Sequence, residues 1–157
     1  MSPVEMVSEV LALYARRGVF RAFSEGVVRK GNMTFSIVWH YGRRFDVVLD
    51  TEKGIIRFQN VLSEVPANSP MYSDLKTFIK SRQAHTIPEH RAIDPRKALV
   101  KPYNRRGNVC LSVQVKDEDY VYGTRKLVHL VNEIFLVFLI DGAYYEYLIE
   151  TLGVDPV

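Results

Sequence analysis

The 157-residue sequence has a single cysteine, Cys110. A lone thiol cannot form an intramolecular disulfide, so a disulfide-stabilised scaffold is excluded and a reducing compartment is favoured. Long apolar runs are also missing: residues 127–140 form the longest one, but His129, Asn132 and Glu133 interrupt it, and it is shorter than the ~20 apolar residues that cross a bilayer. The first residues lack the basic start and apolar run of a secretory signal. These absences predict a soluble, cytoplasmic protein without a membrane span.

Motifs that carry chemistry are equally scarce. The sequence contains neither a glycine-rich phosphate loop nor a GxSxG nucleophile elbow. His85 and His90 are the nearest pair of histidines, and no further cluster of Cys or His supplies the three or four ligands of a zinc site. Cys110 lies in a strand pattern, which favours a packed thiol over a nucleophile. We therefore expect no enzymatic activity, no catalytic residues, no metal site and no cofactor, and keep a metal site or a Cys110 nucleophile only as minor alternatives.

What the sequence does contain is the composition of an ordinary globular protein, with 47% hydrophobic and 25% charged residues. At this length a chain buries roughly 70% of the surface of its unfolded state, so it needs no metal or disulfide to stay folded. The length also fits one domain, and we expect residues 1–157 to form a single one.

Helical spacing of apolar residues predicts the first element, a helix over residues 3–17 that ends at Gly18. Three strands follow, at residues 34–39, 45–49 and 55–62. Because the links between them are short, these strands must form an antiparallel meander. Residues 19–32 are the least legible part of the chain, with a short strand at 19–23 as the only suggestion.

The middle strand of this meander carries two carboxylates, Asp46 and Asp50, four residues apart. Paired carboxylates can act as a general acid and a general base. Here Phe45, Val47 and Leu49 alternate with polar positions, so the two acids are interpreted as the polar side of a half-buried strand.

A second helix is predicted to begin where Ser69 can cap it and Pro70 suits the first helical position, and to continue to about residue 83. After a connector, a second hairpin pairs residues 97–103 with residues 109–116. Pro102 cannot donate a backbone hydrogen bond, which favours an edge position for the first of these two strands.

The last helix follows three acids at positions 117–119, which suit a helix start, and we expect it to end at Asp141-Gly142. Eleven of the fourteen residues from 127 to 140 are apolar, more than one small sheet is expected to cover. The predicted dimer or partner surface consists of Leu130, Ile134, Phe135 and Phe138. His129 and Glu133 interrupt this surface one helical turn apart, and are interpreted as a polar stripe that pairs internally or meets solvent.

The predicted fold is therefore α+β, an antiparallel sheet with helices packed on it, in the order α-β-β-β-α-β-β-α. This order, with the stretch from Arg105-Arg106-Gly107-Asn108 through the apolar strand into residues 127–139, resembles the type III secretion chaperone-like fold and the bacterial sensory-transduction-regulator family that shares it. The resemblance implies a non-enzymatic, commonly dimeric protein that binds extended segments of other proteins along exposed sheet and helix surfaces. Secretion chaperones tend to be acidic, whereas this chain has a formal net charge of +3.

The positive charge is concentrated in residues 81–106, where seven basic and two acidic residues give a net charge of +5. The rest of the chain is at −2, and such asymmetry can mark an anionic partner. The candidate anion-binding residues are Arg96, Lys97, Lys101, Arg105 and Arg106. Tyr103 beside them offers a ring on which a base could stack, although charge runs more often only keep a surface solvated.

Together these patterns predict a protein-binding module with a chaperone-like or adaptor role that pairs with itself or with another protein. A nucleic-acid or polyanion binder that uses residues 81–106 is the alternative, less favoured because no helix-turn-helix or RNA-binding signature occurs. An enzyme is the least favoured of the three classes.

Overall fold

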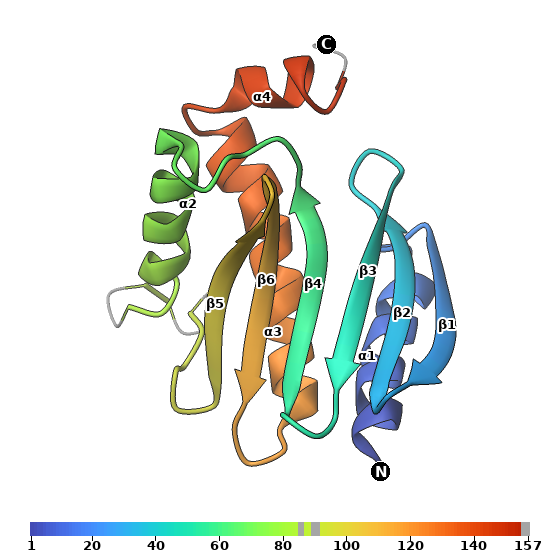
Figure 1. The fold of residues 1–157 in the computed structure, drawn as a ribbon. Coiled ribbons are helices and arrows are strands. Elements are labelled where there is room, and N and C mark those ends of the chain that lie inside the picture. Colours follow the sequence, from blue (N-terminus) through green and yellow to red (C-terminus); the bar gives the residue numbers. More distant parts are fainter. Residues whose placement is uncertain (85–86, 89–91, 155–157) are drawn as a thin grey trace.

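A six-stranded antiparallel sheet with helices on one of its faces forms the protein, as the computed structural model shows (Figure 1). The structure describes residues 1–84, 87–88 and 92–154. The α+β class predicted from the sequence is confirmed. In chain order the elements are α1 (Pro3–Arg16), β1 (Ala22–Arg29), β2 (Asn32–Trp39), β3 (Arg43–Asp50), β4 (Ile55–Leu62), α2 (Pro70–Ser81), β5 (Ala98–Arg105), β6 (Asn108–Val115), α3 (Tyr120–Glu133), the π-helical η1 (Ile134–Ile140) and α4 (Tyr145–Glu150).

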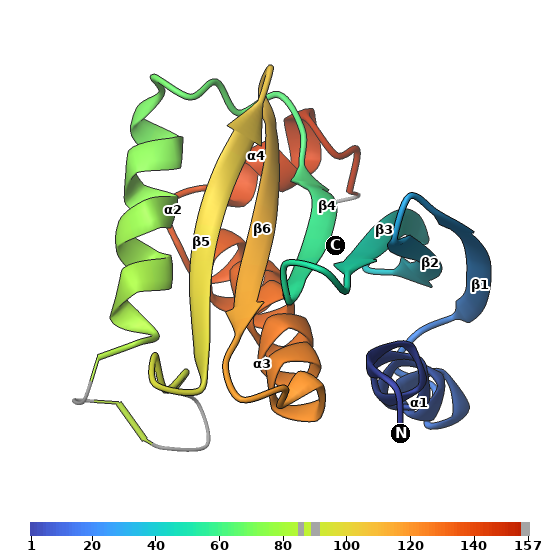
Figure 2. The same cartoon turned by 60° about the horizontal axis from the view of Figure 1, so that its bottom comes forward.

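The strands lie in the order β1-β2-β3-β4-β6-β5, so β1 and β5 form the two edges of the sheet. In Figure 1, α1 and α3 lie behind the sheet and α2 lies beside β5, while the other face looks toward the viewer with no described helix over it. Figure 2 gives the same arrangement from another direction. Pro102 on β5 thus stands in an edge strand, as its missing backbone donor predicted.

Local signals set the helix starts where the sequence predicted them. The Ser69 hydroxyl accepts a hydrogen bond from the backbone N–H of Tyr72 at 3.2 Å, and Pro70 occupies the first position of α2. The Asp119 carboxylate caps α3 in the same way. The other two acids expected at this helix start, Asp117 and Glu118, instead occupy the preceding turn, with φ angles of 52° and 55°.

The strand β1 is absent from the predicted order α-β-β-β-α-β-β-α, because four strands and not three precede α2. The sequence suggested only a possible short strand at residues 19–23, whereas β1 is an eight-residue strand, Ala22–Arg29, that pairs with β2. The sequence of β1 shows no alternation of apolar and polar residues, because almost all of its side chains are exposed. A bulge lies between Glu25 and Val28. Within it only glycine fits at position 26, because a Cβ atom there would lie 2.7 Å from the carbonyl oxygen of Thr34.

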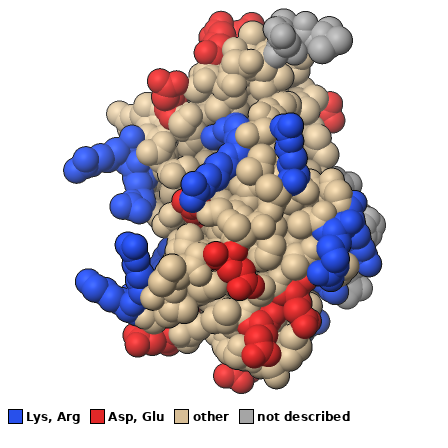
Figure 3. Space-filling model, turned by 90° about the vertical axis from the view of Figure 1, so that its right-hand side faces the viewer, with Lys and Arg blue, Asp and Glu red and all other residues tan. Residues whose placement is uncertain are grey.

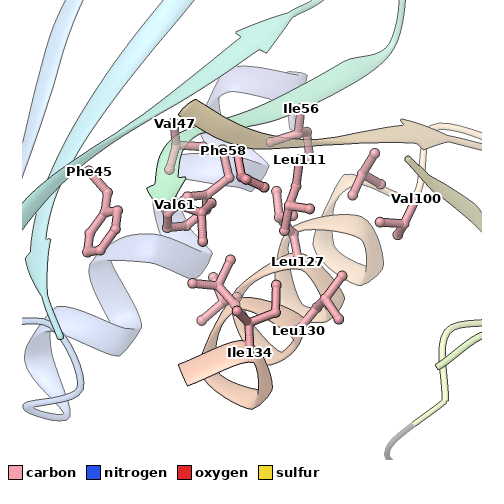
Figure 4. Packing of buried hydrophobic residues seen from close by; sticks show 14 of the residues in the cluster. Phe45, Val47, Ile56, Phe58, Val61, Val100, Leu111, Leu127, Leu130 and Ile134 are labelled. Atoms are coloured by element: carbon pink, nitrogen blue, oxygen red, sulfur yellow. The ribbon is translucent and has the colours of Figure 1, made fainter. Parts of the chain in front are cut away.

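The core lies between the helices and one face of the sheet. Figure 4 shows Phe45, Phe58 and Leu111 from three strands directed at Leu127 and Leu130 of α3 and Ile134 of η1. Every second residue of β2 and β3 belongs to this core, because side chains alternate along a strand. The acids Asp46 and Asp50 occupy the opposite side of β3, as their spacing predicted.

The apolar surface of α3 and η1, predicted to face a partner, is instead buried inside one chain. Leu130, Ile134, Phe135 and Phe138 are 1%, 0%, 0% and 8% exposed, so in this chain they are core residues and form no exposed dimer surface. Sheet residues cover most of them, and helix α2 covers the rest: the ring of Phe138 packs 5.5 Å from Phe78. The helix continues through η1 before the break at residues 141–143.

β3 and β4 stop pairing beyond Asp46 and Gln59, where Figure 1 shows the two strands diverging. Side chains form hydrogen bonds with the backbone groups that are left unpaired there. Arg43 donates to the carbonyl oxygen of Val61 at 3.1 Å. The Tyr147 hydroxyl of α4 accepts from the N–H of Ser63 at 3.0 Å and donates to the carbonyl of Ser63 at 2.5 Å. These side chains thus take the place of β3 beside the end of β4, which on its other side still pairs with β6 through Leu62 and Val109.

Beside the place where β3 and β4 diverge, His40 lies between two rings, 4.1 Å from Trp39 and 4.3 Å from Phe135 between centroids. Its Nε2 atom is buried and has no hydrogen-bond partner among the described residues. Burial, followed by the charge of Arg43, lowers the pKa of His40 from 6.5 to about 4. The folded protein therefore holds this imidazole neutral.

This lowered pKa makes the stability of the fold sensitive to acid. Below pH 6.5 His40 becomes protonated in the unfolded chain, whereas in the folded chain it stays neutral until about pH 4. The contribution of neutral His40 to the free energy of unfolding is therefore fully present above pH 6.5 and is lost as the pH falls toward 4. His40→Phe keeps an aromatic ring but removes the titration. We expect urea unfolding at pH 7 and at pH 4.5 to show a smaller loss of stability in the variant. Equal losses in both proteins would contradict the role assigned to His40.

Candidate functional site

The face of the sheet that the described helices leave uncovered is lined by polar and half-buried side chains. One row crosses five strands through Thr34, Val48, Arg57, Ser112 and Lys101, which are successive cross-strand partners. All but Lys101 are half-buried by their neighbours, and Lys101 is exposed. Because cross-strand partners point to the same side of a sheet, these residues form one continuous row across the five strands.

Basic groups gather on the part of this face formed by β4, β6 and β5. Arg57 lies 3.7 Å from Asp50, which partly balances its charge. Lys101 and Arg105 are exposed on β5, and neither makes an ion pair within the part of the chain that the structure describes. Tyr103 stands between them on the same side of the strand.

The Tyr103 phenol has an environment that keeps its proton in place. Burial, then the nearby Cys110 thiol, raise the pKa of Tyr103 to about 12, and the charges of Arg57 and Arg105 offset only part of this rise. Cys110 itself is 1% exposed, which fits the packed thiol inferred from the strand pattern. The phenol therefore stays neutral and leaves the surrounding positive charge undiminished.

The five predicted anion-binding residues do not form one patch. Arg96 and Lys97 precede β5, whereas Arg105 and Arg106 follow at its other end, roughly 23 Å away along an eight-residue strand. Hydrogen bonds from the Arg96 side chain lower the pKa of Asp94, so this arginine is already occupied by a carboxylate. Lys97 lies over the ring of Tyr122 at 5.0 Å, beside an open hollow of about 500 Å³. Lys101 joins the uncovered face instead.

Arg82, another basic residue of the segment 81–106, is mostly buried and therefore does not belong to the basic surface. The Arg82 guanidinium lies 2.7 Å from the Glu133 carboxylate, and His129 lies 2.9 Å from the other oxygen of the same group. The side chains of Arg82 and Glu133 are only 14% and 7% exposed. The cluster joins α2 to α3, so the polar stripe predicted from His129 and Glu133 does pair internally. Its third member could not be found from spacing, because Arg82 lies 51 residues from Glu133.

The sheet edge at β1 is a second accessible surface. Its other side has no strand partner among the described residues, and Val27 and Val28 are 73% and 61% exposed. The opposite edge differs, because β5 carries Pro102 and contacts α2. The free backbone groups of β1 and two exposed valines therefore lie together at one edge.

Neither metal ligands nor a membrane span add a site in the part of the chain that the structure describes. His85 and His90 lie outside the described residues. Within the described residues no three His, Cys, Asp or Glu side chains are grouped closely enough to hold a metal ion. In that same part of the chain, none of the helices has the length and apolar character to span a bilayer.

Removing the buried guanidinium should cost substantial stability. Arg82→Met leaves the Glu133 carboxylate buried without its closest cation, and loss of one partner of a buried ion pair typically costs about 3 kcal/mol. Lys80→Met, on the exposed side of the same helix, is the matched control and should change stability by less than about 0.5 kcal/mol. Urea denaturation followed by circular dichroism measures both. Equal stability of the two variants would refute a structural role for the cluster.

A search of known protein families, curated proteins and solved structures found nothing that matches this chain.

Proposed function

We propose that the protein is a non-enzymatic binding module that takes up an extended segment of another protein by strand addition at β1. The observation that carries this proposal is the unpaired edge of β1 beside the exposed Val27 and Val28. A peptide added to such an edge gains main-chain hydrogen bonds, and apolar side chains next to it supply contact area.

The features of β1 support an accessible edge over a protected one. Natural edge strands are commonly blunted by proline, by charges, by bulges or by a covering element. β1 has a bulge but no proline, and one of its two charged side chains, Glu25, is engaged by the hydroxyl of Ser8 on α1. The bulge at Gly26 limits regular pairing to the stretches on either side of it, so a short segment fits better than a long strand.

Strand addition also agrees with a chaperone-like or adaptor role. Main-chain hydrogen bonds do not depend on side-chain identity, so one edge can accept segments of different sequence. A second copy of the chain could present its own β1 to the same edge, which would give a homodimer. Both outcomes agree with what the resemblance to the chaperone-like fold implies, and a reducing cytoplasm suits the single, buried Cys110.

The alternative, a nucleic-acid binder based on residues 81–106, has weaker support. Arg82 is used inside the protein, Arg96 is paired with Asp94, and the remaining cations that the structure describes are distributed along β5 and just beyond its two ends. A phosphate backbone is best held by neighbouring cations, each of which releases a counterion.

A photo-crosslinking amino acid at Val27 tests the proposal. In cells that produce the protein, we expect crosslinks from this position to another protein, or to a second copy of the 18.1 kDa chain. The same amino acid at Thr77, exposed on α2, should give none of these products.

A positive charge at the edge of β1 should abolish the crosslinks formed from position 27. Val28→Lys adds a positive charge where a partner strand would pack, and should remove the crosslinks from position 27 without unfolding the protein. Val19→Lys makes the same change at an exposed valine outside the strand and should leave them intact. Crosslinks that persist in both variants, or that form equally from positions 27 and 77, would exclude strand addition at β1.

A further inference from the structure

We infer that the uncovered face formed by β4, β6 and β5 docks an acidic, extended segment of a partner protein, held by Arg57, Lys101 and Arg105. This surface lies near the opposite edge of the sheet from β1, so the inference goes beyond strand addition.

The spacing of the three cations suits an extended chain. Arg57 and Lys101 are both partnered with Ser112, one on each side of β6, which separates them by two strand spacings or roughly 10 Å. Lys101 and Arg105 are four residues apart on one side of β5, roughly 13 Å. Acidic residues four apart in an extended segment have this same spacing, so a segment parallel to β5 can bring carboxylates to both cations.

The charge balance of the face selects an anionic occupant. Its two acids are already engaged: Asp46 lies 3.5 Å from Arg44 and accepts a hydrogen bond from Ser36, and Asp50 lies near Arg57. Lys101 and Arg105 therefore present positive charge that the described residues leave uncompensated. In Figure 3, which faces the β1 edge, the uncovered face lies along the left side of the view, where Lys and Arg side chains project and Asp and Glu side chains lie near them.

The aromatic content of the face favours a protein segment over a nucleic acid. Proteins that bind single-stranded nucleic acids stack successive bases on several aromatic rings. Tyr103 is the only aromatic residue that the described strands place on this face, and it is half-buried. Its neutral phenol does not repel carboxylates. Gln59, two residues from Arg57 on the same side of β4, adds an amide that can donate hydrogen bonds to them.

Fluorescence anisotropy of the full chain with a labelled peptide of alternating Glu and Thr, about twelve residues long, tests this inference. We expect saturable binding at low salt that weakens as salt is added, because surface charges are screened. Lys101→Glu combined with Arg105→Glu should weaken binding at least tenfold. The matched control, Lys30→Glu combined with Lys53→Glu, makes the same charge change in exposed turns and should weaken it less than twofold.

Three outcomes would overturn the inference. If the peptide does not bind the folded protein, the face is not a docking site for acidic segments. If both double variants weaken binding equally, the peptide responds only to the net charge of the protein and not to this face. If single-stranded DNA of similar length and charge binds at least as tightly and depends on Lys101 and Arg105, the occupant is a nucleic acid. None of these results affects crosslinking at β1, so the two proposals can fail separately.

Discussion

In β2 and β3 every second side chain is buried against the helices, while its neighbours face away from them. This alternation has a physical consequence for the whole molecule. The apolar side is removed from water only where helices cover it: α1 and α3 lie on that side, and α2, beside β5, adds residues to the same core. The polar side needs no cover, because its groups pair with one another or with solvent. The uncovered face and the free edge at β1 both follow from a core that is built on one side only.

Much of the fold could be predicted from patterns that act over a few residues. Caps at Ser69 and Asp119 fixed two helix starts, and Pro102 indicated an edge strand. The strand β1 could not be predicted from the sequence, because an exposed edge strand buries too few side chains to produce an alternating apolar pattern. The assignment of Phe138 to a partner surface failed for a related reason. Hydrophobicity reports that a residue must be covered, and only the three-dimensional arrangement reveals that its own chain covers it.

The candidate sites illustrate the same limit for charged residues. The sequence places seven cations in one segment, but that segment contains a connector and a full strand, so neighbours along the chain become distant in space. Arg82 is drawn inward by Glu133, and Arg57, outside the segment, joins Lys101 across β6. Charge density along the chain therefore identified some members of the basic surface without giving its position or its extent.

The hydrogen bonds of Tyr147 have a consequence for the order of folding. The Tyr147 hydroxyl pairs with both backbone groups of Ser63, 84 residues earlier in the chain, and the buried Leu148 lies in the same helix. Contacts between residues so far apart form slowly, because closing a long loop costs entropy. Both backbone groups of Ser63 therefore stay bonded to water until α4 docks, and the docking of α4 completes the fold at this end of the sheet.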